Sequence, residues 1–243
     1  KLATVLTVDQ FVENKYVVMA TKKGRVKKTD LMAYSRRRSG GLIGVKLAEG
    51  DELIVARITD GDMNVFLGSQ GGKVIRFHEG DVRATARGSM GVRGMRIDPE
   101  VKVVGMEVLG PEDTLLTVTE NGYGKRSSIE EYRTQTRGGK GVFSIKTSKR
   151  NGLMVSLLLV DDNDELMMVT DKGKLIRTSI KGINVISRNT QGVKLINLSS
   201  GEKLIGIARL PEEEDQAEED QDDMNIEDLS VDKENGDGEG IDS

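Results

Sequence analysis

Residues 132–146 read YRTQTRGGKGVFSIK and place four cations and three glycines in fifteen positions. Glycine lets a backbone approach a ligand closely, arginine can fork onto phosphate oxygens, and lysine adds a point charge. The chemistry that this loop suits is therefore phosphate contact, through Arg137 and Lys140 above all. The alternative is that Gly138 and Gly141 serve a tight turn between repeated units and that the cations are merely solvated.

The charge of the chain is divided unevenly between a basic body and an acidic tail. Residues 211–243 hold sixteen acids and the single base Lys233, which leaves 35 bases and 24 acids in residues 1–210. The body therefore carries a net charge of +11 and the tail −15. A basic globular part followed by an acidic run points to a polyanionic partner.

Several classes of protein are excluded by composition. The chain has no cysteine and one histidine, His78, so it can hold neither disulfides nor a zinc or iron–sulfur site built on Cys/His clusters. No apolar run approaches the ~18 residues of a transmembrane helix, and the first residues do not resemble a signal peptide. We find no nucleotide-binding or hydrolase motif, and expect no catalytic and no metal-binding residue.

The cationic loop belongs to one of four repeats, each about fifty residues long. Each repeat has an apolar run, a turn with glycine, a basic strand, a Gly-Val pair about nineteen residues later and a second apolar run. The turn glycines are Gly24, Gly72, Gly122 and Gly173, and the pairs begin at Gly44, Gly91, Gly141 and Gly192. A fixed period of this length indicates a repeat architecture.

Each repeat reads as a small antiparallel sheet. Its apolar runs are rich in Val, Ile and Thr and too short for helices. The T/S-x-x-G quartets, such as residues 21–24 and 170–173, fit hairpin turns whose last residue has a positive φ. We therefore predict an all-β, propeller-like array of such sheets.

The repeats resemble the C-terminal domain of the A subunit of bacterial DNA gyrase over residues 1–210. The resemblance rests on VFLGSQGGKVIRF, LLTVTENGYGKRSSIEEY, VDDNDELMMVTDKGKLIRT and SRNTQGVKLI. It implies a β-pinwheel, a propeller variant whose basic rim wraps double-stranded DNA in support of ATP-dependent negative supercoiling. It also implies that the chain works with the remainder of gyrase A and with gyrase B in an A2B2 assembly. The expected location is the cytoplasm, at the nucleoid, with no membrane contact. The fragment itself would need no cofactor, since ATP, Mg²⁺ and the cleaving tyrosine act elsewhere in that enzyme.

The repeats and the charge pattern divide the chain into three parts. Residues 1–11 are expected to be the closing strand of a truncated blade, because residues 2–8 match the end of a repeat; at least one further blade would then precede them. Residues 12–210 form the pinwheel, with blades at about 12–60, 61–110, 111–160 and 161–210. Residues 211–243 are expected to be a disordered acidic tail.

The family has a seven-residue signature, Gln-(Arg/Lys)-Arg-Gly-Gly-Lys-Gly, which the opening loop matches at six positions. The match is Gln135-Thr136-Arg137-Gly138-Gly139-Lys140-Gly141, with Thr136 as the departure. In the family this box sits in the first blade, whereas the match lies in the third complete repeat here. We therefore interpret it as a box-like blade loop.

Other cations are candidates for DNA contact. One recurs four residues after each turn glycine and would form a ring of charge at one height, although these side chains could instead bridge neighbouring blades. The remainder form exposed clusters or lie on the box-like loops. The full set of DNA-binding candidates is Lys22, Lys23, Lys28, Arg36, Arg37, Arg38, Arg76, Arg83, Arg87, Arg93, Arg126, Arg137, Lys140, Arg177 and Arg188.

Two other functions remain open from the sequence. One is the equivalent domain of topoisomerase IV, which has a more degenerate box and fewer blades. The other is a propeller scaffold that binds protein. The basic body favours a polyanion over a protein partner, and salt-dependent retention on DNA would distinguish the two.

Deleting residues 211–243 should tighten DNA binding several-fold at low salt. A flexible chain of this length reaches on the order of 30 Å, so its sixteen acids would compete with DNA for the basic body at a high effective concentration. The gain should shrink as salt screens both polyanions. A binding titration that gives equal affinities for the intact and truncated chains at low salt would show that the tail only solubilises.

Overall fold

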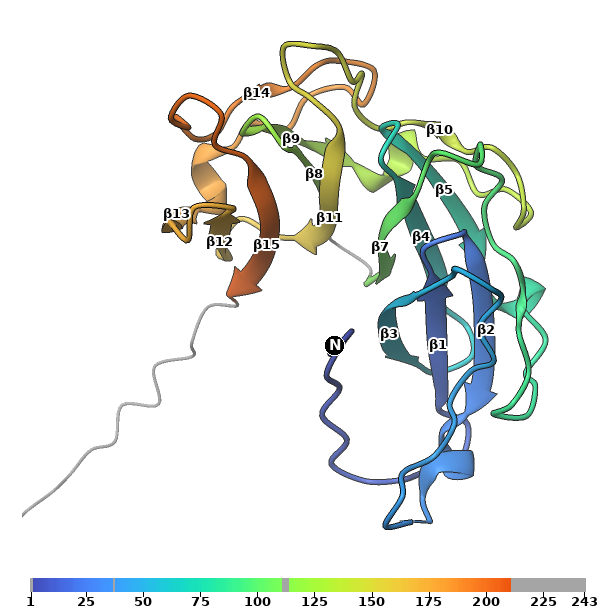
Figure 1. Ribbon diagram of the computed structural model, residues 1–243. Coiled ribbons are helices and arrows are strands. Elements are labelled where there is room, and N and C mark those ends of the chain that lie inside the picture. The colour runs from blue at the N-terminus through green and yellow to red at the C-terminus, as the bar shows by residue number, and fades with distance from the viewer. Residues whose placement is uncertain (1, 37, 111–113, 211–243) are drawn as a thin grey trace, which may run out of the picture. The chain divides into compact units, whose positions relative to one another are not determined.

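The computed structural model describes residues 2–36, 38–110 and 114–210 (Figure 1). By its contacts the chain separates into the units Lys1–Glu212 and Glu213–Ser243. The predicted disordered tail, residues 211–243, lies outside the described residues. The described residues form β-strands joined by turns, loops and four short 3-10 helices.

The strands form four antiparallel sheets, which we call blades 1 to 4. Their orders are β3-β1-β2-β6, β10-β5-β4-β7, β11-β8-β9-β14 and β13-β12-β15. The predicted all-β, propeller-like fold with four blades is confirmed. The strands are β1 (Tyr16–Thr21), β2 (Arg25–Asp30), β3 (Leu53–Thr59), β4 (Asn64–Ser69), β5 (Lys73–His78), β6 (Val92–Arg93), β7 (Val103–Val108), β8 (Thr114–Thr119), β9 (Tyr123–Ser128), β10 (Val142–Phe143), β11 (Met154–Val160), β12 (Glu165–Thr170), β13 (Leu175–Ser179), β14 (Val193–Lys194) and β15 (Leu204–Leu210).

The central hairpin of each blade follows the predicted turn. In blade 1 the N–H of Gly24 donates to the carbonyl of Thr21 at 2.9 Å, and the same bond closes the other three turns at Gly72, Gly122 and Gly173. The second strand of each hairpin then continues into a 3-10 helix. These helices are η1 (Leu31–Tyr34), η2 (Glu79–Asp81), η3 (Ile129–Glu131) and η4 (Ile180–Gly182).

The fourth strand of blades 1 to 3 comes from the following repeat. β6 pairs with β2, β10 with β5 and β14 with β9, always antiparallel. Each of these sheets therefore crosses a boundary between sequence repeats, which the division into 12–60, 61–110, 111–160 and 161–210 did not anticipate. We call four segments arms, each beginning at a 3-10 helix: arm 1 is residues 31–50, arm 2 is 79–97, arm 3 is 129–147 and arm 4 is 180–198. Arms 2, 3 and 4 contain the donated strands β6, β10 and β14.

The hydrophobic cores lie between blades. One cluster joins Val18 and Val26 of blade 1 to Leu67 and Phe77 of blade 2, with Met95 of arm 2 among them. Two similar clusters join blade 2 to blade 3 and blade 3 to blade 4. β7 also lies against both β3 and β11, and β15 lies against β11 (Figure 1). Each blade is thus stabilised by its neighbours, because a single small sheet buries little apolar surface alone.

The prediction that residues 1–11 close a truncated blade stays a prediction, because it concerns pairing with strands that would precede this segment. Residues 2–11 form no strand. The four strand positions of blade 1 are filled by β3, β1, β2 and β6, so this segment adds no strand to blade 1. Leu6 and Val8 pack instead against the small cluster of Val17 and Met19.

Two turn glycines differ in what surrounds them. Gly72 has φ of +76°, and a Cβ added there would lie 2.1 Å from the carbonyl oxygen of Ile145 in arm 3. Gly173 has the same backbone conformation, φ +77°, but nothing lies within 4 Å of an added Cβ. Gly72 is therefore required by both its conformation and its close approach to an arm, and Gly173 by its conformation alone.

Gly72→Ala should destabilise the protein clearly more than Gly173→Ala. Both variants place alanine in the left-handed region, which costs about 1–2 kcal/mol. Gly72→Ala also forces the arm 3 backbone away, for roughly another 1–3 kcal/mol. Thermal unfolding followed by circular dichroism should show the larger loss of Tm for Gly72→Ala. Equal losses would mean that the contact with Ile145 contributes nothing.

Candidate nucleic-acid interface

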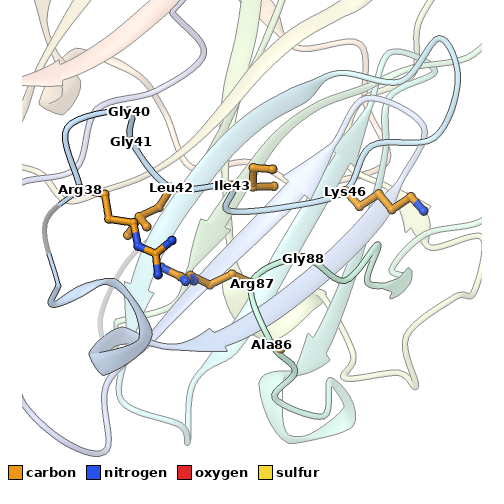
Figure 2. A pocket seen from close by; sticks show the side chains of 9 residues that line it. All are labelled: Arg38, Gly40, Gly41, Leu42, Ile43, Lys46, Ala86, Arg87 and Gly88. Carbon is orange, nitrogen blue, oxygen red and sulfur yellow. The ribbon is translucent and has the colours of Figure 1, made fainter.

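The loops of arms 1 and 2 form a basic pocket. A cavity of about 840 Å³ is lined by Arg38, Gly40, Gly41, Leu42, Ile43 and Lys46 of arm 1 and by Ala86, Arg87 and Gly88 of arm 2 (Figure 2). Its lining includes three cations and no carboxylate. In the view of Figure 2 the side chains of Arg38 and Arg87 extend toward one another, while Lys46 lies at the other end.

A buried lysine joins the two loops that carry this pocket. The Nζ of Lys27, on β2, donates to the carbonyl of Gly44 at 2.6 Å and to that of Arg87 at 2.5 Å. Lys27 is only 2% exposed, and burial followed by the charge of Arg87 lowers its pKa from 10.5 to about 8. One ammonium group thus joins the loop of arm 1 to the loop of arm 2.

The pocket could bind phosphate by the chemistry predicted for such loops. Three cationic side chains supply charge, and the glycines leave the backbone open to approach. The sequence predicted Arg38 and Arg87, and the structure brings them together. It did not predict Lys46 or Lys27, although Lys46 follows Gly44-Val45 directly and could have been found from that repeat position.

The box-like loop at residues 135–141 makes several hydrogen bonds to the neighbouring arm. Arg137 donates from Nε to the carbonyl of Asp81 at 2.9 Å and from Nη1 to that of Arg93 at 3.2 Å. The N–H of Gly138 donates to the carbonyl of Gly94 at 2.6 Å. In this loop Lys140 is exposed. The loop therefore fastens arm 3 to arm 2, which is the structural role weighed for its glycines.

The arginine four residues before the Gly-Val pair of arms 2, 3 and 4 makes different contacts in different arms. In arm 4, Nη1 of Arg188 donates to the carbonyl of Phe143 at 3.0 Å, just as Arg137 reaches Arg93. Arg87 holds the same position in arm 2, but its side chain lines the cavity between arms 1 and 2 instead (Figure 2). The pocket thus exposes a guanidinium group that the later arms use to join one another.

The cations four residues after the turn glycines do not form an exposed ring. Lys28 is buried and pairs with Glu79 at 3.1 Å. Arg76 donates to the carbonyls of Ile129 and Tyr132. Each of these side chains reaches from its own blade to the arm that completes that blade. They therefore bridge neighbouring blades, which was the alternative prediction.

Arg126 and Arg177 complete this series and differ from one another. Arg126 is buried and donates to the carbonyl of Ile183 at 2.8 Å, in arm 4. Arg177 is exposed and pairs with Glu165 of its own blade. Blade 4 therefore lacks the bridge that the other three blades make within the described residues.

The remaining candidates lie at the surface in most cases. Lys23 donates to the carbonyl of Glu49 at 2.7 Å, and Lys22 pairs with Glu52. Arg36, Arg83 and Arg93 are exposed, and Arg37 lies outside the described residues. Within residues 2–36, 38–110 and 114–210, no group of three His, Asp or Glu side chains could hold a metal ion. No helix of this part is long and apolar enough to cross a membrane.

Comparison with protein families gives one match that recurs four times. The family described as "DNA gyrase C-terminal domain, beta-propeller" matches residues 15–60, 64–109, 113–161 and 164–211. The A subunit of DNA gyrase from Salmonella typhimurium is 46% identical over 218 residues, which cover 90% of this chain and 25% of that protein. The same protein of Mycolicibacterium smegmatis is 39% identical and covers 90% of this chain and 26% of that protein. The chain thus spans about a quarter of the length of these relatives.

Solved structures share the architecture. A DNA gyrase A C-terminal domain aligns with a TM-score of 0.76 at 26% identity, covering 84% of this chain and 68% of that one. The C-terminal domain of a DNA topoisomerase IV aligns with a TM-score of 0.79 at 23% identity, covering 84% of this chain and 64% of that one. The second likeness is one of fold alone.

The stability of the protein should rise as pH increases from about 8 to about 10. The folded chain releases the Lys27 proton near pH 8, whereas the unfolded chain holds it to about 10.5. Between these values the unfolded state binds more protons, so the unfolding free energy increases with pH. Burial lowers the pKa of Lys125 to about 8 as well. Lys27→Met should therefore remove roughly half of the rise in urea unfolding experiments, and an unchanged rise would contradict the lowered pKa of Lys27.

Proposed function

Because the chain belongs to the DNA gyrase C-terminal domain family, we propose that it binds double-stranded DNA through the phosphate backbone along its arms. The observation that carries this proposal is the pocket of Arg38, Lys46 and Arg87, which gathers three cations around glycine-rich loops and no carboxylate. A phosphate is the ligand that this combination of charge and open backbone fits.

The binding is proposed to be independent of base sequence. Base readout requires an element that enters a groove and presents side chains to base edges. In the described part of the chain the helices are single 3-10 turns of three or four residues. The arms that carry the cations are loops, which suit contact with backbone phosphates.

Several arms together are proposed to guide a bent duplex. Bending a short duplex smoothly costs several kcal/mol, so wrapping requires contacts spread over many sites. Lys46, Arg87, Arg93 and Lys140 stand on three successive arms, two of them at the pocket. In the whole enzyme, with the rest of gyrase A and with gyrase B, this wrapping would support ATP-dependent negative supercoiling in the cytoplasm.

A protein-binding scaffold is the competing function. The two functions differ in their response to salt, because displacement of counterions from DNA makes log K fall steeply with log[salt], by about 0.9 for each phosphate contacted. A flat response, or clear preference among unrelated duplexes of equal length, would contradict backbone binding to DNA.

The double variant Arg38→Gln/Arg87→Gln should weaken DNA binding and make it less sensitive to salt. If each guanidinium contacts one phosphate, the slope of log K against log[salt] should flatten by about 1.8. The matched control is Lys172→Gln/Arg209→Gln, which removes the same charge from exposed positions in blade 4, away from the pocket. Fluorescence anisotropy with a labelled duplex measures both. Equal effects of the two double variants would show that net charge, and not the pocket, controls binding.

A further inference from the structure

In blades 2 and 3 an aromatic ring lies beside a cation where the donated strand pairs with the sheet. Phe143 of β10 pairs with Lys73 of β5, and the Nζ of Lys73 lies 5.1 Å from the centroid of the ring. In blade 3 the order is reversed, because Lys194 of β14 pairs with Tyr123 of β9, at 5.8 Å from Nζ to centroid. The two members of the pair exchange strands, while the combination of ring and cation stays the same.

The ring of Phe143 lines a cavity of about 280 Å³ together with three cations. The cavity is bounded by the blade 2 turn, arm 2 and arm 3, and its cations are Lys73, Arg96 and Lys140. Arg96 and Lys140 are exposed, and Phe143 is itself 41% exposed. Asp98 is the one carboxylate among the described residues of the lining, so the cavity has a net positive charge.

The ring of Tyr123 lines a second cavity, of about 320 Å³, with the same kinds of neighbour. Its cations are Arg150, Lys194 and Lys203, and the buried Glu202 is the one carboxylate among its described lining residues. The guanidinium carbon of Arg150 lies 5.0 Å from the centroid of the ring. A hydrogen bond from Arg150, followed by the charges of Lys194 and Arg150, lowers the pKa of Tyr123. This ring therefore also lies in a positive environment.

The pairing of a ring with a cation is not needed to seat an arm. At the same place in blade 1, Arg25 of β2 pairs with Arg93 of β6, and the donated strand is held without an aromatic residue there. Both cavities belong to four-stranded blades, and β7 of blade 2 lies against strands of both neighbouring blades. The two sites are therefore features of complete blades and not of a free edge.

An aromatic ring beside several cations has the chemistry that recognises an unpaired nucleotide. Proteins that bind single strands stack the bases on aromatic side chains and hold the phosphates with basic ones. Bases inside a duplex already stack on one another, so only an unpaired base can offer its face to a ring. Cavities near the lower end of the range for small ligands, about 300 Å³, suit one nucleotide each.

We propose that each of these two cavities binds one unpaired nucleotide. Its base stacks on Phe143 or Tyr123, and its phosphate binds the cations around that ring. The nucleotide belongs to a single strand or is free, and the chemistry of recognition is the same in both cases. This activity is separate from contact with the backbone of a duplex and does not depend on the pocket of arms 1 and 2.

Crosslinking to the unmodified full chain tests the two sites directly. Under near-ultraviolet light, a short oligothymidine with 5-iodouracil in place of some bases forms covalent bonds to the side chains on which its bases stack. Peptide mapping should place these bonds on Phe143 and Tyr123. Phe11 is the internal control, because it is 42% exposed and lines neither cavity. Equal labelling of Phe11 and the two proposed rings would overturn the proposal.

The double variant Tyr123→Leu/Phe143→Leu should bind oligothymidine at least about tenfold more weakly, because stacking is lost while an apolar side chain remains. Fluorescence anisotropy with a duplex of the same length should show less than about a twofold change, because duplex binding uses phosphate contacts. Phe11→Leu, the matched control, should leave both affinities unchanged. Tyr123→Phe keeps the ring and should retain the affinity for the single strand.

The outcomes separate the proposal from its alternatives. Equal losses for the double variant and Phe11→Leu, or a parallel loss of single-strand and duplex binding by a double variant that is still folded, would overturn it. Should the double variant not fold, the crosslinks on the unmodified chain decide. Competition by thymidine monophosphate at equal nucleotide concentration would support a site for free nucleotides, and much weaker competition would support a site for single strands.

Discussion

The backbone contact between each turn glycine and the arm of the next repeat is the constraint on which the rest of the structure depends. The carbonyls of Gly24, Gly72 and Gly122 each accept two arm N–H groups, and the donated strand then extends the sheet. A single sheet of three strands has little core of its own, whereas the clusters that bury Val18, Leu67 and Met95 span two blades. The formation of a complete blade is therefore coupled to its association with the next blade.

This constraint also decides what the cations do. An arm seated on a blade brings carbonyl groups next to basic side chains, and Lys28, Arg76 and Arg126 satisfy those groups or a buried carboxylate. A buried carbonyl without a donor would reduce the stability of the protein by about 1–3 kcal/mol. A basic residue at this position therefore has a structural role in each blade that contains a donated strand. The regular recurrence of charge along the sequence thus reflects the joints between blades.

The sequence was sufficient for the fold class because periodicity, turn glycines and β-branched runs all act locally. It located four sheets and their hairpins, and it identified Arg38 and Arg87 among the binding candidates. It could not reveal that β6, β10 and β14 belong to preceding blades, since strands of two residues carry almost no pattern. The sequence also could not separate the bridging Arg126 from an exposed cation, because the strict alternation of side chains along a strand is compatible with either. Lys27 was missed because a lysine in a basic strand gives no sign of being buried.

The pocket shows how one loop design serves two purposes. Arg137 and Arg188 occupy equivalent positions and use their donors on the backbone of the preceding arm, which leaves them less free to meet a ligand. Arg87 holds that position in arm 2, and its guanidinium faces the cavity. The guanidinium at this position is therefore available to a phosphate in the arm where it lines the cavity and does not bind the backbone of the preceding arm.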